Sequence, residues 1–357
     1  MDLATLRGDI DRVDDELLEL LNERARLVAQ VATLKERMQV PFYVPSRERA
    51  IVERLSARNA GPFPTDAIRP VFQEIMSACL SLEKTVRVAY FGPEGTFTHM
   101  AVKRQFGLSA RAIPVGTIGG VFEEVARGGA DFGVVPVENS TEGVVNHTLD
   151  TFLLSDLRIS AEIILEVNQC LLCRAGLELS QIERIYSHPQ ALAQCRRWLS
   201  TNLPRVTIIE SASTSDAARL ARDDTHGAAI GSELAAKLYD LTVARRNLAD
   251  SAHNVTRFLV VGAKQAEPTG RDRTSILLEL SDAPGILFKV LEPFARRGVN
   301  MSKIESRPSR RRPWEYVFFI DVDGHQRDAA IEAAVEEVRP MVASLKVLGS
   351  YPRAESL

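Results

Sequence analysis

The sequence predicts a multidomain chain with an all-α three-helix segment, a two-lobed α/β domain and a ferredoxin-like βαββαβ domain. Apolar residues recur at three-and-four spacing over residues 1–85, without a strand-like run. Over residues 86–263, short β-branched runs alternate with helical stretches. Over residues 273–357, the patterns follow the order strand, helix, strand, strand, helix, strand. A chain of 357 residues is long enough for two or three such domains.

The first predicted helix, residues 2–38, is much longer than an average helix. Its apolar positions are Leu3, Leu6, Ile10, Val13, Leu17, Leu20, Leu27, Val31 and Leu34. A second helix is predicted at 47–58 with Ser46 as N-cap, and a third at 66–84 with Thr65 as N-cap. Because three helices form too thin a layer to bury this apolar stripe, we expect a second copy of the chain to cover it.

The α/β part is predicted from seven strand-like runs that helical stretches such as PQALAQCRRWLSTN and SDAARLARDD separate. The runs are VRVAYFG, FGVVPVE, LRISAEIILEVNQCLLC, RIYSH, VTIIES, AAIGS and FLVVGA. The polar stretch 264–272, KQAEPTGRD, is the expected linker to the last domain. There the basic run Arg310–Arg312 falls between the two middle strands, which favours a solvated hairpin tip over a polyanion site.

Composition favours a small-molecule ligand. The chain has 44 Lys and Arg against 47 Asp and Glu, and this near balance argues against nucleic-acid and anionic-membrane partners. No apolar run approaches the roughly 20 residues that span a bilayer, and the start has no apolar signal-peptide core, so a cytoplasmic protein is expected. Cys170 and Cys173 form a lone CxxC, but on a strand they would point to opposite faces, so we predict no metal and no other cofactor.

Three cations on the first helix have informative spacing. Arg24 and Lys35 lie within about 20° of one helix face and about 16 Å apart, so they can hold opposite ends of one anion. Arg7 lies roughly 25 Å from Arg24 along the same helix and could reach that anion only from a second subunit. Each charge alone also fits a solvated helix surface.

The segments LRGDIDRVDDELLELLNERARLVAQVATLK and PSRERAIVERL resemble the helical chorismate mutase family, an intertwined dimer. The resemblance implies that Arg24, Arg47 and a partner subunit's Arg7 bind the two carboxylates of chorismate, that Lys35 faces the ether oxygen and that Glu48 takes the ring hydroxyl. Two positions depart from the family's enteric branch, Val44 in place of an acid and Glu83 in place of a Gln. Glu83 could donate to the ether oxygen only while protonated, which predicts a mutase activity that weakens as pH rises.

Two polar motifs mark the α/β part. GPEGTFTH leads from the first strand into a helix start at Thr96 to Thr98, where free N–H groups favour an anion. A nucleotide loop is not favoured, because GK[ST] and GxGxxG are both missing. In PVENSTEG a buried strand ends in a polar cluster, the position where open α/β sheets bind ligands, although chance turn polarity fits this segment alone.

With YSHPQALAQC, STSDAA, IGSELAA and NVTRFLVV, these motifs resemble prephenate dehydratase in the family's order. The resemblance makes Thr256 the leading catalytic residue, with Asn139, Ser187 and Gln194 placing the substrate. It puts in or beside the cleft Glu138, Ser140, Thr141, Ser213, Thr214, Arg257 and Phe258. A hydroxyl donor can assist the departing ring hydroxyl while CO2 is lost. His188 is an alternative general acid, but a structural role before Pro189 fits equally well.

Residues 273–351 resemble the ACT domain of the same enzymes through DAPGILFKVL and NMSKIESRP. The resemblance implies pairing across subunits and a phenylalanine site at that interface. The expected site residues are Gly285, Ile286, Leu287, Asn300, Glu305, Ser306 and Arg307. Gly285 would expose N–H groups to the carboxylate, and Asn300 would hold the ammonium group. A domain that serves only dimerisation is the alternative.

Together the three resemblances predict a bifunctional chorismate mutase/prephenate dehydratase with a C-terminal ACT domain. Such a chain rearranges chorismate to prephenate, converts prephenate to phenylpyruvate, and is inhibited by L-phenylalanine, the dehydratase more than the mutase. A homodimer or higher homo-oligomer is expected. Two alternatives are a non-catalytic amino-acid-binding protein and a prephenate or arogenate dehydratase with a weakened or lost mutase.

Overall fold

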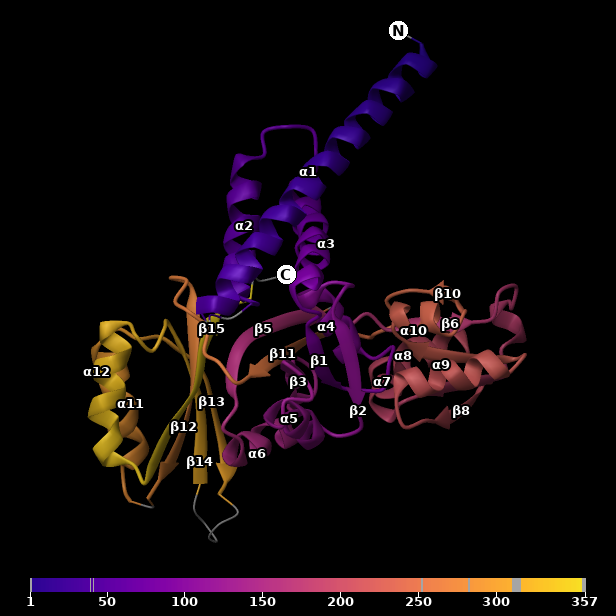
Figure 1. The fold of residues 1–357 in the computed structure, drawn as a ribbon. Helices are drawn as coiled ribbons and strands as arrows, with labels where there is room; N and C mark the ends of the chain where they lie inside the picture. The colour runs from indigo at the N-terminus through magenta and orange to yellow at the C-terminus, as the bar shows by residue number, and fades with distance from the viewer. Residues whose placement is uncertain are drawn as a thin grey trace. The chain divides into compact units, whose positions relative to one another are not determined.

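A computed structural model describes residues 2–38, 40, 42–251, 253–281, 283–309 and 316–354. The chain forms two compact units, Met1–Arg87 with Phe106–Arg111, and Val88–Gln105 with Ala112–Leu357 (Figure 1). The predicted hairpin tip at Arg310–Arg312 lies outside the described residues. Within the described ranges, no helix combines the length and the apolar character needed to cross a membrane.

The first unit contains the three predicted helices, α1 (Leu3–Met38), α2 (Pro45–Arg58) and α3 (Thr65–Glu83). The 36 residues of α1 extend over about 54 Å. None of the described residues of α1 is buried. Its exposed large apolar side chains, here called the α1 stripe, are Leu3, Leu6, Ile10, Val13, Leu17, Leu18, Leu20, Leu21, Leu27, Val31, Leu34 and Met38.

Both predicted N-caps in this unit are wrong. The N-cap of α2 is Val44, which makes no side-chain cap, and Ser46 lies inside the first turn that Pro45 begins. The N-cap of α3 is Pro64, and Thr65 is the first helical residue. At α2 the proline is the first helical residue, where its fixed φ suits the helix entry and its missing N–H is no loss.

The second unit begins with a mixed sheet of order β2-β1-β3-β11-β5, in which β4 pairs with β3. The last of these strands along the chain, β11, lies antiparallel between β3 and the edge strand β5. The elements of this first lobe are β1 (Arg87–Phe91), α4 (Phe97–Phe106), β2 (Arg111–Val115), α5 (Ile118–Ala126), β3 (Phe132–Asn139), β4 (Gly143–Val144), α6 (Asn146–Leu154), β5 (Arg158–Glu166) and β11 (Val255–Gly262).

The second lobe has a five-stranded sheet of order β10-β6-β9-β7-β8. The parallel strands β7, β8 and β9 alternate with helices, as the sequence predicts for this region. Its elements are β6 (Cys170–Cys173), η1 (Leu179–Gln181), β7 (Arg184–Ser187), α7 (Pro189–Gln194), α8 (Arg196–Asn202), β8 (Thr207–Glu210), α9 (Thr214–Asp223), β9 (Gly227–Gly231), α10 (Glu233–Leu238) and β10 (Thr242–Arg245).

One predicted strand and one predicted helix are divided in the structure. The segment 157–173 forms β5 in the first lobe and β6 in the second, so the chain crosses between lobes at 167–169. The predicted helix PQALAQCRRWLSTN breaks at Cys195 into α7 and α8. On β6, Cys170 packs with the alanines of α9 and α10, whereas Cys173 packs in the core on the other face. The strand interpretation of the CxxC pair is therefore confirmed.

The C-terminal domain has the predicted βαββαβ order and a sheet of order β13-β14-β12-β15. In Figure 1 its helices lie on the side of the sheet that faces away from the first lobe. The elements are β12 (Asp272–Leu280), α11 (Ile286–Arg296), β13 (Met301–Pro308), β14 (Tyr316–Asp323), α12 (Ala329–Val338), η2 (Arg339–Met341) and β15 (Ser344–Pro352).

The two faces of the C-terminal sheet are buried by different partners. Ile276 and Ile320 point to one face and share a core with α11 and α12. Leu277 and Phe319 point to the other face, in one core with apolar residues of the first lobe. At Gly349 a Cβ atom would stand 2.3 Å from the carbonyl oxygen of Ile159, so β15 approaches β5 closely. The first lobe and this sheet therefore form one packed structure.

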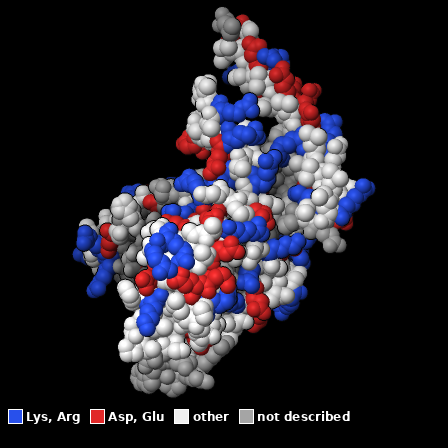
Figure 2. Space-filling model, turned by 90° about the vertical axis from the view of Figure 1, so that its left-hand side faces the viewer, with Lys and Arg blue, Asp and Glu red and all other residues white. Residues whose placement is uncertain are grey.

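Charged side chains of both signs are mixed on the surface. On the face shown in Figure 2, basic and acidic side chains are interspersed, in keeping with a formal net charge of -3.

Candidate active and regulatory sites

Four charged side chains of the first unit form two pairs between its helices, and the two pairs are here together called the charged cluster. Lys35 Nζ, near the end of α1, lies 3.5 Å from Glu83 Oε2 at the end of α3. The same ammonium group donates to the carbonyl oxygen of Phe42 at 2.8 Å. Arg24, on the same face of α1 as Lys35, acts on Glu48 of α2 through its charge. Both cations are half-buried, whereas most of α1 is exposed.

Glu48 has the most perturbed carboxyl group of this cluster. The residue is half-buried, and desolvation raises the pKa of its carboxyl group to about 7. A hydrogen bond from Tyr43 and the charge of Arg24 oppose this rise only in part. Tyr43 was not among the predicted site residues; it is 5% exposed, and its ring packs at a tilt against that of Phe106.

Two atoms of the cluster are buried without a hydrogen bond to any described residue, Arg24 Nη1 and Glu83 Oε2. Buried polar atoms in folded proteins are normally hydrogen-bonded. Arg24 Nη1 is therefore available to a polar ligand, whereas Glu83 Oε2 already faces Lys35 Nζ at 3.5 Å. The other two predicted cations of this site, Arg7 and Arg47, are both exposed. Arg7 is about 25 Å from Arg24 along α1.

In the second unit, the predicted residues Asn139 and Thr256 form a direct pair. They lie opposite each other where β3 and β11 pair. Asn139 Nδ2 donates to Thr256 Oγ1 at 2.8 Å and to Asn254 Oδ1 at 2.8 Å. Asn139 Oδ1 accepts from the backbone N–H of Thr141 and of Glu142. The amide is thereby fixed at both ends, and both residues of the pair are 9% exposed.

Polar contacts continue from this pair towards the second lobe. Asn254 Nδ2 donates to Gln194 Oε1 at 2.8 Å, and Gln169 Nε2 donates to the same oxygen at 3.1 Å. Ser140 Oγ donates to the carbonyl oxygen of His253 and accepts from Val255 N–H. Asn254 was not among the predicted site residues, although it stands two positions before Thr256 in the quoted NVTRF motif.

The remaining predicted residues of the cleft have structural partners. Ser187 is fully buried and donates to the carbonyl oxygen of Ile230. His188 is the N-cap of α7 and accepts from Gln190 N–H, which supports its structural role. Ser213 caps α9 by accepting from Asp216 N–H, directly before Thr214.

The GPEG loop is held against the second lobe. Ser232 Oγ donates to the carbonyl oxygen of Gly95 at 2.6 Å, and a Cβ atom at Gly95 would stand 2.8 Å from Ser215 Oγ. Gly95 has a φ of +81°, which a residue with a Cβ rarely adopts. The loop ends at Thr96, whose hydroxyl accepts from His99 N–H. Thr98, in the first turn of α4, is buried.

Three other predicted residues of the cleft do not contact the Asn139 and Thr256 pair. Glu138 binds Lys303 of β13, with 2.7 Å between Oε2 and Nζ. Arg257 binds Asp321 of β14, with 2.6 Å between Nη1 and Oδ2. Phe258 is 2% exposed and belongs to the interior.

The residues predicted to bind an effector are divided between the two ends of the C-terminal domain. Gly285, with a φ of +74°, is the N-cap of α11, and Ile286 and Leu287 begin that helix. Asn300 lies beyond the other end of α11, where its Nδ2 donates to Asp323 Oδ2 at 2.8 Å. A helix of 11 residues separates the two positions, a distance of about 16 Å.

The other three, Glu305, Ser306 and Arg307, lie near the end of β13, an outer strand of the sheet. In the strand register, this end of β13 lies at the same end of the sheet as the end of β12 that leads to Gly285, with β14 between the two strands. Arg307 Nη2 binds the carboxylate of Asp150 on α6 at 3.0 and 3.2 Å.

Comparison with known proteins accounts for each part of the chain. The chorismate mutase type II family matches residues 6–84, the prephenate dehydratase family residues 88–266 and the ACT domain family residues 274–340. The chain is 48% identical to the bifunctional chorismate mutase/prephenate dehydratase of Aquifex aeolicus, over 99% of this chain and 98% of that protein. The chain belongs to this family. It is 44% identical to the Pseudomonas aeruginosa relative of the same name, with the same coverage.

A solved structure supports the fold of the dehydratase and ACT domains. The prephenate dehydratase of Arthrobacter aurescens, solved in complex with L-Phe, is 38% identical with a TM-score of 0.70. The match covers 75% of this chain and 90% of that one. The predicted fold classes are therefore confirmed, and the chain is an enzyme with a mutase and a dehydratase domain rather than a non-catalytic amino-acid binder.

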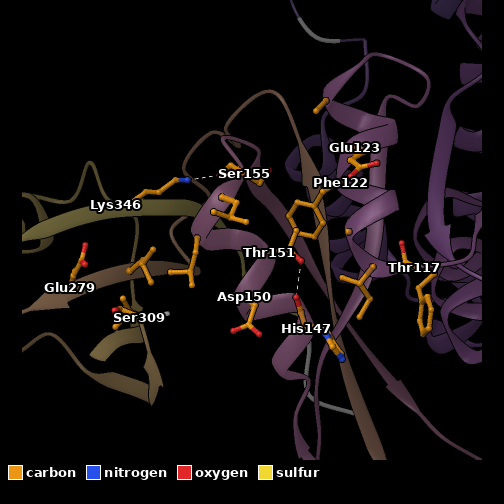
Figure 3. A pocket seen from close by; sticks show the side chains of 18 of the residues that line it. Thr117, Phe122, Glu123, His147, Asp150, Thr151, Ser155, Glu279, Ser309 and Lys346 are labelled. Atoms are coloured by element: carbon orange, nitrogen blue, oxygen red, sulfur yellow. Dashed lines mark hydrogen bonds between the residues drawn. The ribbon is translucent and has the colours of Figure 1, made fainter. Parts of the chain in front are cut away.

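A cavity of about 980 Å³ lies away from both clusters. It lies between α5 and α6 of the dehydratase domain and the ACT sheet (Figure 3). Its lining is mostly apolar, with His147, Asp150 and Lys346 among the polar exceptions. None of the residues predicted to act in either reaction lines it. We therefore place the candidate active sites by their polar side chains rather than by cavity size.

Proposed function

We propose that the cluster of Arg24, Lys35, Glu48 and Glu83 is the mutase site of this bifunctional enzyme. We propose further that Asn139 and Thr256 are the centre of its dehydratase site. The enzyme catalyses two successive steps of phenylalanine biosynthesis, from chorismate to prephenate and from prephenate to phenylpyruvate. The observation that carries the dehydratase proposal is the hydrogen bond from Asn139 to the Thr256 hydroxyl.

The mutase reaction is a pericyclic rearrangement, so its site needs no nucleophile and no proton transfer. Binding must hold a compact conformer and stabilise the negative charge that develops on the ether oxygen. The half-buried cations Arg24 and Lys35 supply this stabilisation, and Glu83 orients Lys35 across the 3.5 Å contact. Arg24 Nη1, buried without a hydrogen-bond partner, is available to a carboxylate of the substrate. Glu48 accepts from the ring hydroxyl.

In the dehydratase reaction, prephenate loses one carboxylate as CO2. The electron pair of the broken C–C bond enters the ring, the C–O bond breaks with its pair on oxygen, and the departing hydroxide becomes water by taking a proton from solvent. Because Thr256 Oγ1 accepts from Asn139, its own hydrogen is directed elsewhere. Among the described residues, no acceptor for that hydrogen is within bonding distance. We assign it to the departing hydroxyl oxygen, where a hydrogen-bond donor assists the leaving group.

We also propose that the active enzyme is a homodimer or a larger homo-oligomer. The α1 stripe leaves an apolar surface along a helix of 36 residues, and a second copy would bury it. The same pairing brings Arg7 of the partner subunit to the mutase site, which Arg7 of the same chain is too distant to reach.

The proposed effector of the ACT domain is L-phenylalanine. Within one chain Asn300 and Gly285 stand at opposite ends of α11, too far apart to hold one small amino acid. Antiparallel pairing of two β13 edges would bring Asn300 of one subunit to the end of β13 near Gly285 of the other. A site between subunits therefore unites the predicted residues, which favours an effector site over a domain that serves only dimerisation.

Incubating the purified chain with chorismate alone tests both activities, with phenylpyruvate as the expected product. Thr256→Ala should lower the dehydratase rate by about a hundred-fold or more, so that prephenate accumulates at the wild-type mutase rate. Lys35→Ala is the matched control, because it should abolish prephenate formation but leave added prephenate fully convertible. Wild-type dehydratase activity in folded Thr256→Ala would contradict the proposed site. If the wild-type chain converts added prephenate but not chorismate, the alternative is favoured, a dehydratase without a working mutase.

A further inference from the structure

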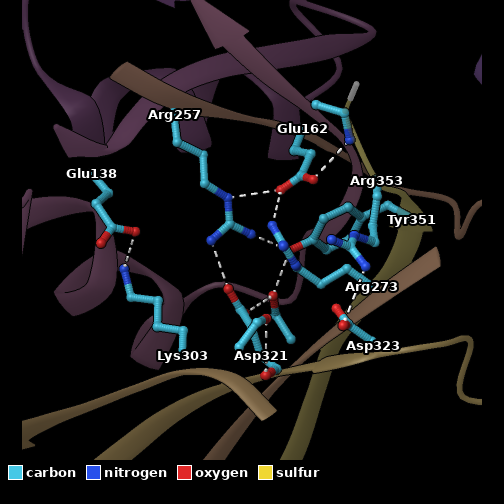
Figure 4. A network of polar contacts seen from close by, with 12 residues as sticks. Glu138, Glu162, Arg257, Arg273, Lys303, Asp321, Asp323, Tyr351 and Arg353 are labelled. Atoms are coloured by element: carbon cyan, nitrogen blue, oxygen red, sulfur yellow. Dashed lines mark hydrogen bonds and ion pairs between the residues drawn. The ribbon is translucent and has the colours of Figure 1, made fainter. Parts of the chain in front are cut away.

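The strand pair that carries Asn139 and Thr256 presents different residues on its two faces. In the register of β3 and β11, Thr256 lies opposite Asn139, and Arg257 lies opposite Glu138. Successive side chains on a strand point to opposite faces. The hydrogen bond between Asn139 and Thr256 marks the face of the proposed active site. Glu138 and Arg257 project from the other face, towards the ACT sheet (Figure 4).

Arg257 ends in a buried network that both domains share. Its Nη1 donates to Asp321 Oδ2 at 2.6 Å, its Nη2 to the Tyr351 hydroxyl at 2.8 Å and its Nε to Glu162 Oε2 at 2.8 Å. Arg273 of β12 donates to the same Glu162 oxygen at 2.7 Å. The two guanidinium groups balance the two carboxylates. Because all three nitrogens of Arg257 are engaged, its position depends on the ACT strands β14 and β15.

The charge balance keeps this network ionised although it is buried. Burial acts to lower the pKa of Arg257, but Tyr351, Asp321 and Glu162 outweigh it and hold that pKa above its ordinary value. The Arg257 and Asp321 side chains are 11% and 9% exposed. Screening by water is therefore weak, and a shift of the ACT sheet is felt directly at Arg257.

Glu138 has a second, separate connection to the ACT domain. Its carboxylate binds Lys303 Nζ at 2.7 Å, and the Lys303 side chain is 13% exposed. Lys303 shares its face of β13 with Glu305 and Arg307, because alternate residues of a strand point the same way. Glu305 and Arg307, which are assigned to effector binding, therefore lie on the same face of β13 as Lys303, the residue that binds Glu138.

We infer that Arg257 and Glu138 are positioning residues for the dehydratase reaction, held by Asp321 and Lys303 of the ACT sheet. This inference rests on the dehydratase site proposed above. Each is adjacent in the chain to one member of the Asn139 and Thr256 pair, so displacement of either side chain shifts the backbone that carries the pair. A misplacement of about 1 Å is enough to cost a large factor in rate.

The same connection gives an effector a route to the reaction. A ligand shifts a conformational equilibrium only if it binds one arrangement better than the other. L-phenylalanine that favours an arrangement with β13 displaced would withdraw Lys303 from Glu138 and loosen the catalytic pair. The inhibited state is then one in which the ACT sheet no longer supports β3 and β11.

Lys303→Met in the full-length chain tests the inference, because methionine keeps the length of the side chain but removes its charge. The turnover number for prephenate should fall about ten-fold, while KM stays within about two-fold, since the variant changes positioning and not substrate contacts. Saturating L-phenylalanine should then inhibit the variant much less than the wild type. Lys303→Arg should restore both turnover and inhibition.

Asp150→Asn is the matched control. Asp150 also binds a β13 residue of the ACT domain, Arg307, but it lies on α6 rather than on a strand of the catalytic pair. Its turnover number for prephenate should remain at the wild-type value. Folding of every variant is checked by its rate of chorismate conversion and by its Tm. If Lys303→Met does not fold, Lys303→Gln takes its place.

The possible results separate the inference from the proposed function. Wild-type protein without dehydratase activity would contradict the proposed function itself. With an active wild type, unchanged turnover in a folded Lys303→Met protein would overturn the inference alone. An equal fall in Asp150→Asn would also overturn it, because any broken contact between the domains would then suffice.

Discussion

The carboxyl group of Glu48 carries opposing influences that set its charge near neutral pH. Desolvation raises its pKa to about 7, against the hydrogen bond from Tyr43 and the charge of Arg24. A carboxyl group that must accept from the ring hydroxyl of chorismate does so best as the carboxylate. The proposed role therefore becomes fully available only above the raised pKa.

We predict that mutase activity rises between about pH 6 and pH 8, because Glu48 loses its proton in this range. Glu48→Gln should lower the activity at pH 8 and remove the rise. The measurement is the rate of chorismate disappearance against pH at saturating and at limiting chorismate.

Glu83→Gln is the control for this profile. It should keep the rise that belongs to Glu48. A flat wild-type profile from about pH 5 to pH 9 would contradict the role of Glu48.

The sequence identified site residues more readily than the strand face on which each side chain lies. Asn139 and Thr256 stand in quoted motifs, and the structure brings them together. Arg257 is in the same motif, but strand alternation turns it to the ACT sheet, a direction that depends on strand pairing. Asn254 and Tyr43 were missed because an amide in a loop and a tyrosine beside two prolines carry no periodic signal.

Among the elements, the long helix α1 was predictable, whereas two short edge strands were not. The apolar spacing of α1 gave its length to within a residue at the N-terminal end. The strands β2 and β10 are at sheet edges and were not predicted. In β2 the sequence RAIPV contains Pro114, which an edge strand tolerates because its missing N–H is not needed for pairing. The division of 157–173 into β5 and β6 was also not predicted, because it depends on which lobe each part joins.

The α1 helix makes a prediction about subunit exchange. Arg7→Ala and Lys35→Ala chains should each lack mutase activity alone. Co-expressed, they should recover about a quarter of wild-type activity, because half of randomly paired dimers are mixed and one of two sites in each is intact. Chorismate conversion measures the recovery. Mixtures as inactive as the single variants would contradict a site shared between subunits.

At the scale of the whole molecule, the ACT sheet and the first dehydratase lobe are less separate than the sequence suggests. The stretch 264–272 was predicted as a linker, yet Leu277 and Phe319, which follow it, share a core with dehydratase residues that precede it. A continuous apolar run such as ILL in β12 indicates a strand with two buried faces, but not which neighbour covers each. The exact domain boundaries at 85, 263 and 273 stay predictions.

This arrangement predicts unequal control of the two activities. The ACT sheet packs on the dehydratase domain within one compact unit, whereas the mutase helices form a unit of their own. Saturating L-phenylalanine should lower the dehydratase rate at least about five-fold and change the mutase rate less than two-fold. Separate assays with prephenate and with chorismate measure the difference, and D-phenylalanine serves as the control ligand. Equal inhibition of both activities would contradict this prediction.

The opposite orientations of Thr256 and Arg257 have an evolutionary consequence. One inserted or deleted residue just before them in β11 would exchange their faces, turning the hydroxyl away from substrate and bringing a cation into its place. Dehydratase catalysis and its inhibition by L-phenylalanine would both be lost through that one change. Lineages of this enzyme can therefore vary which side chains occupy the strand far more freely than they can vary its length.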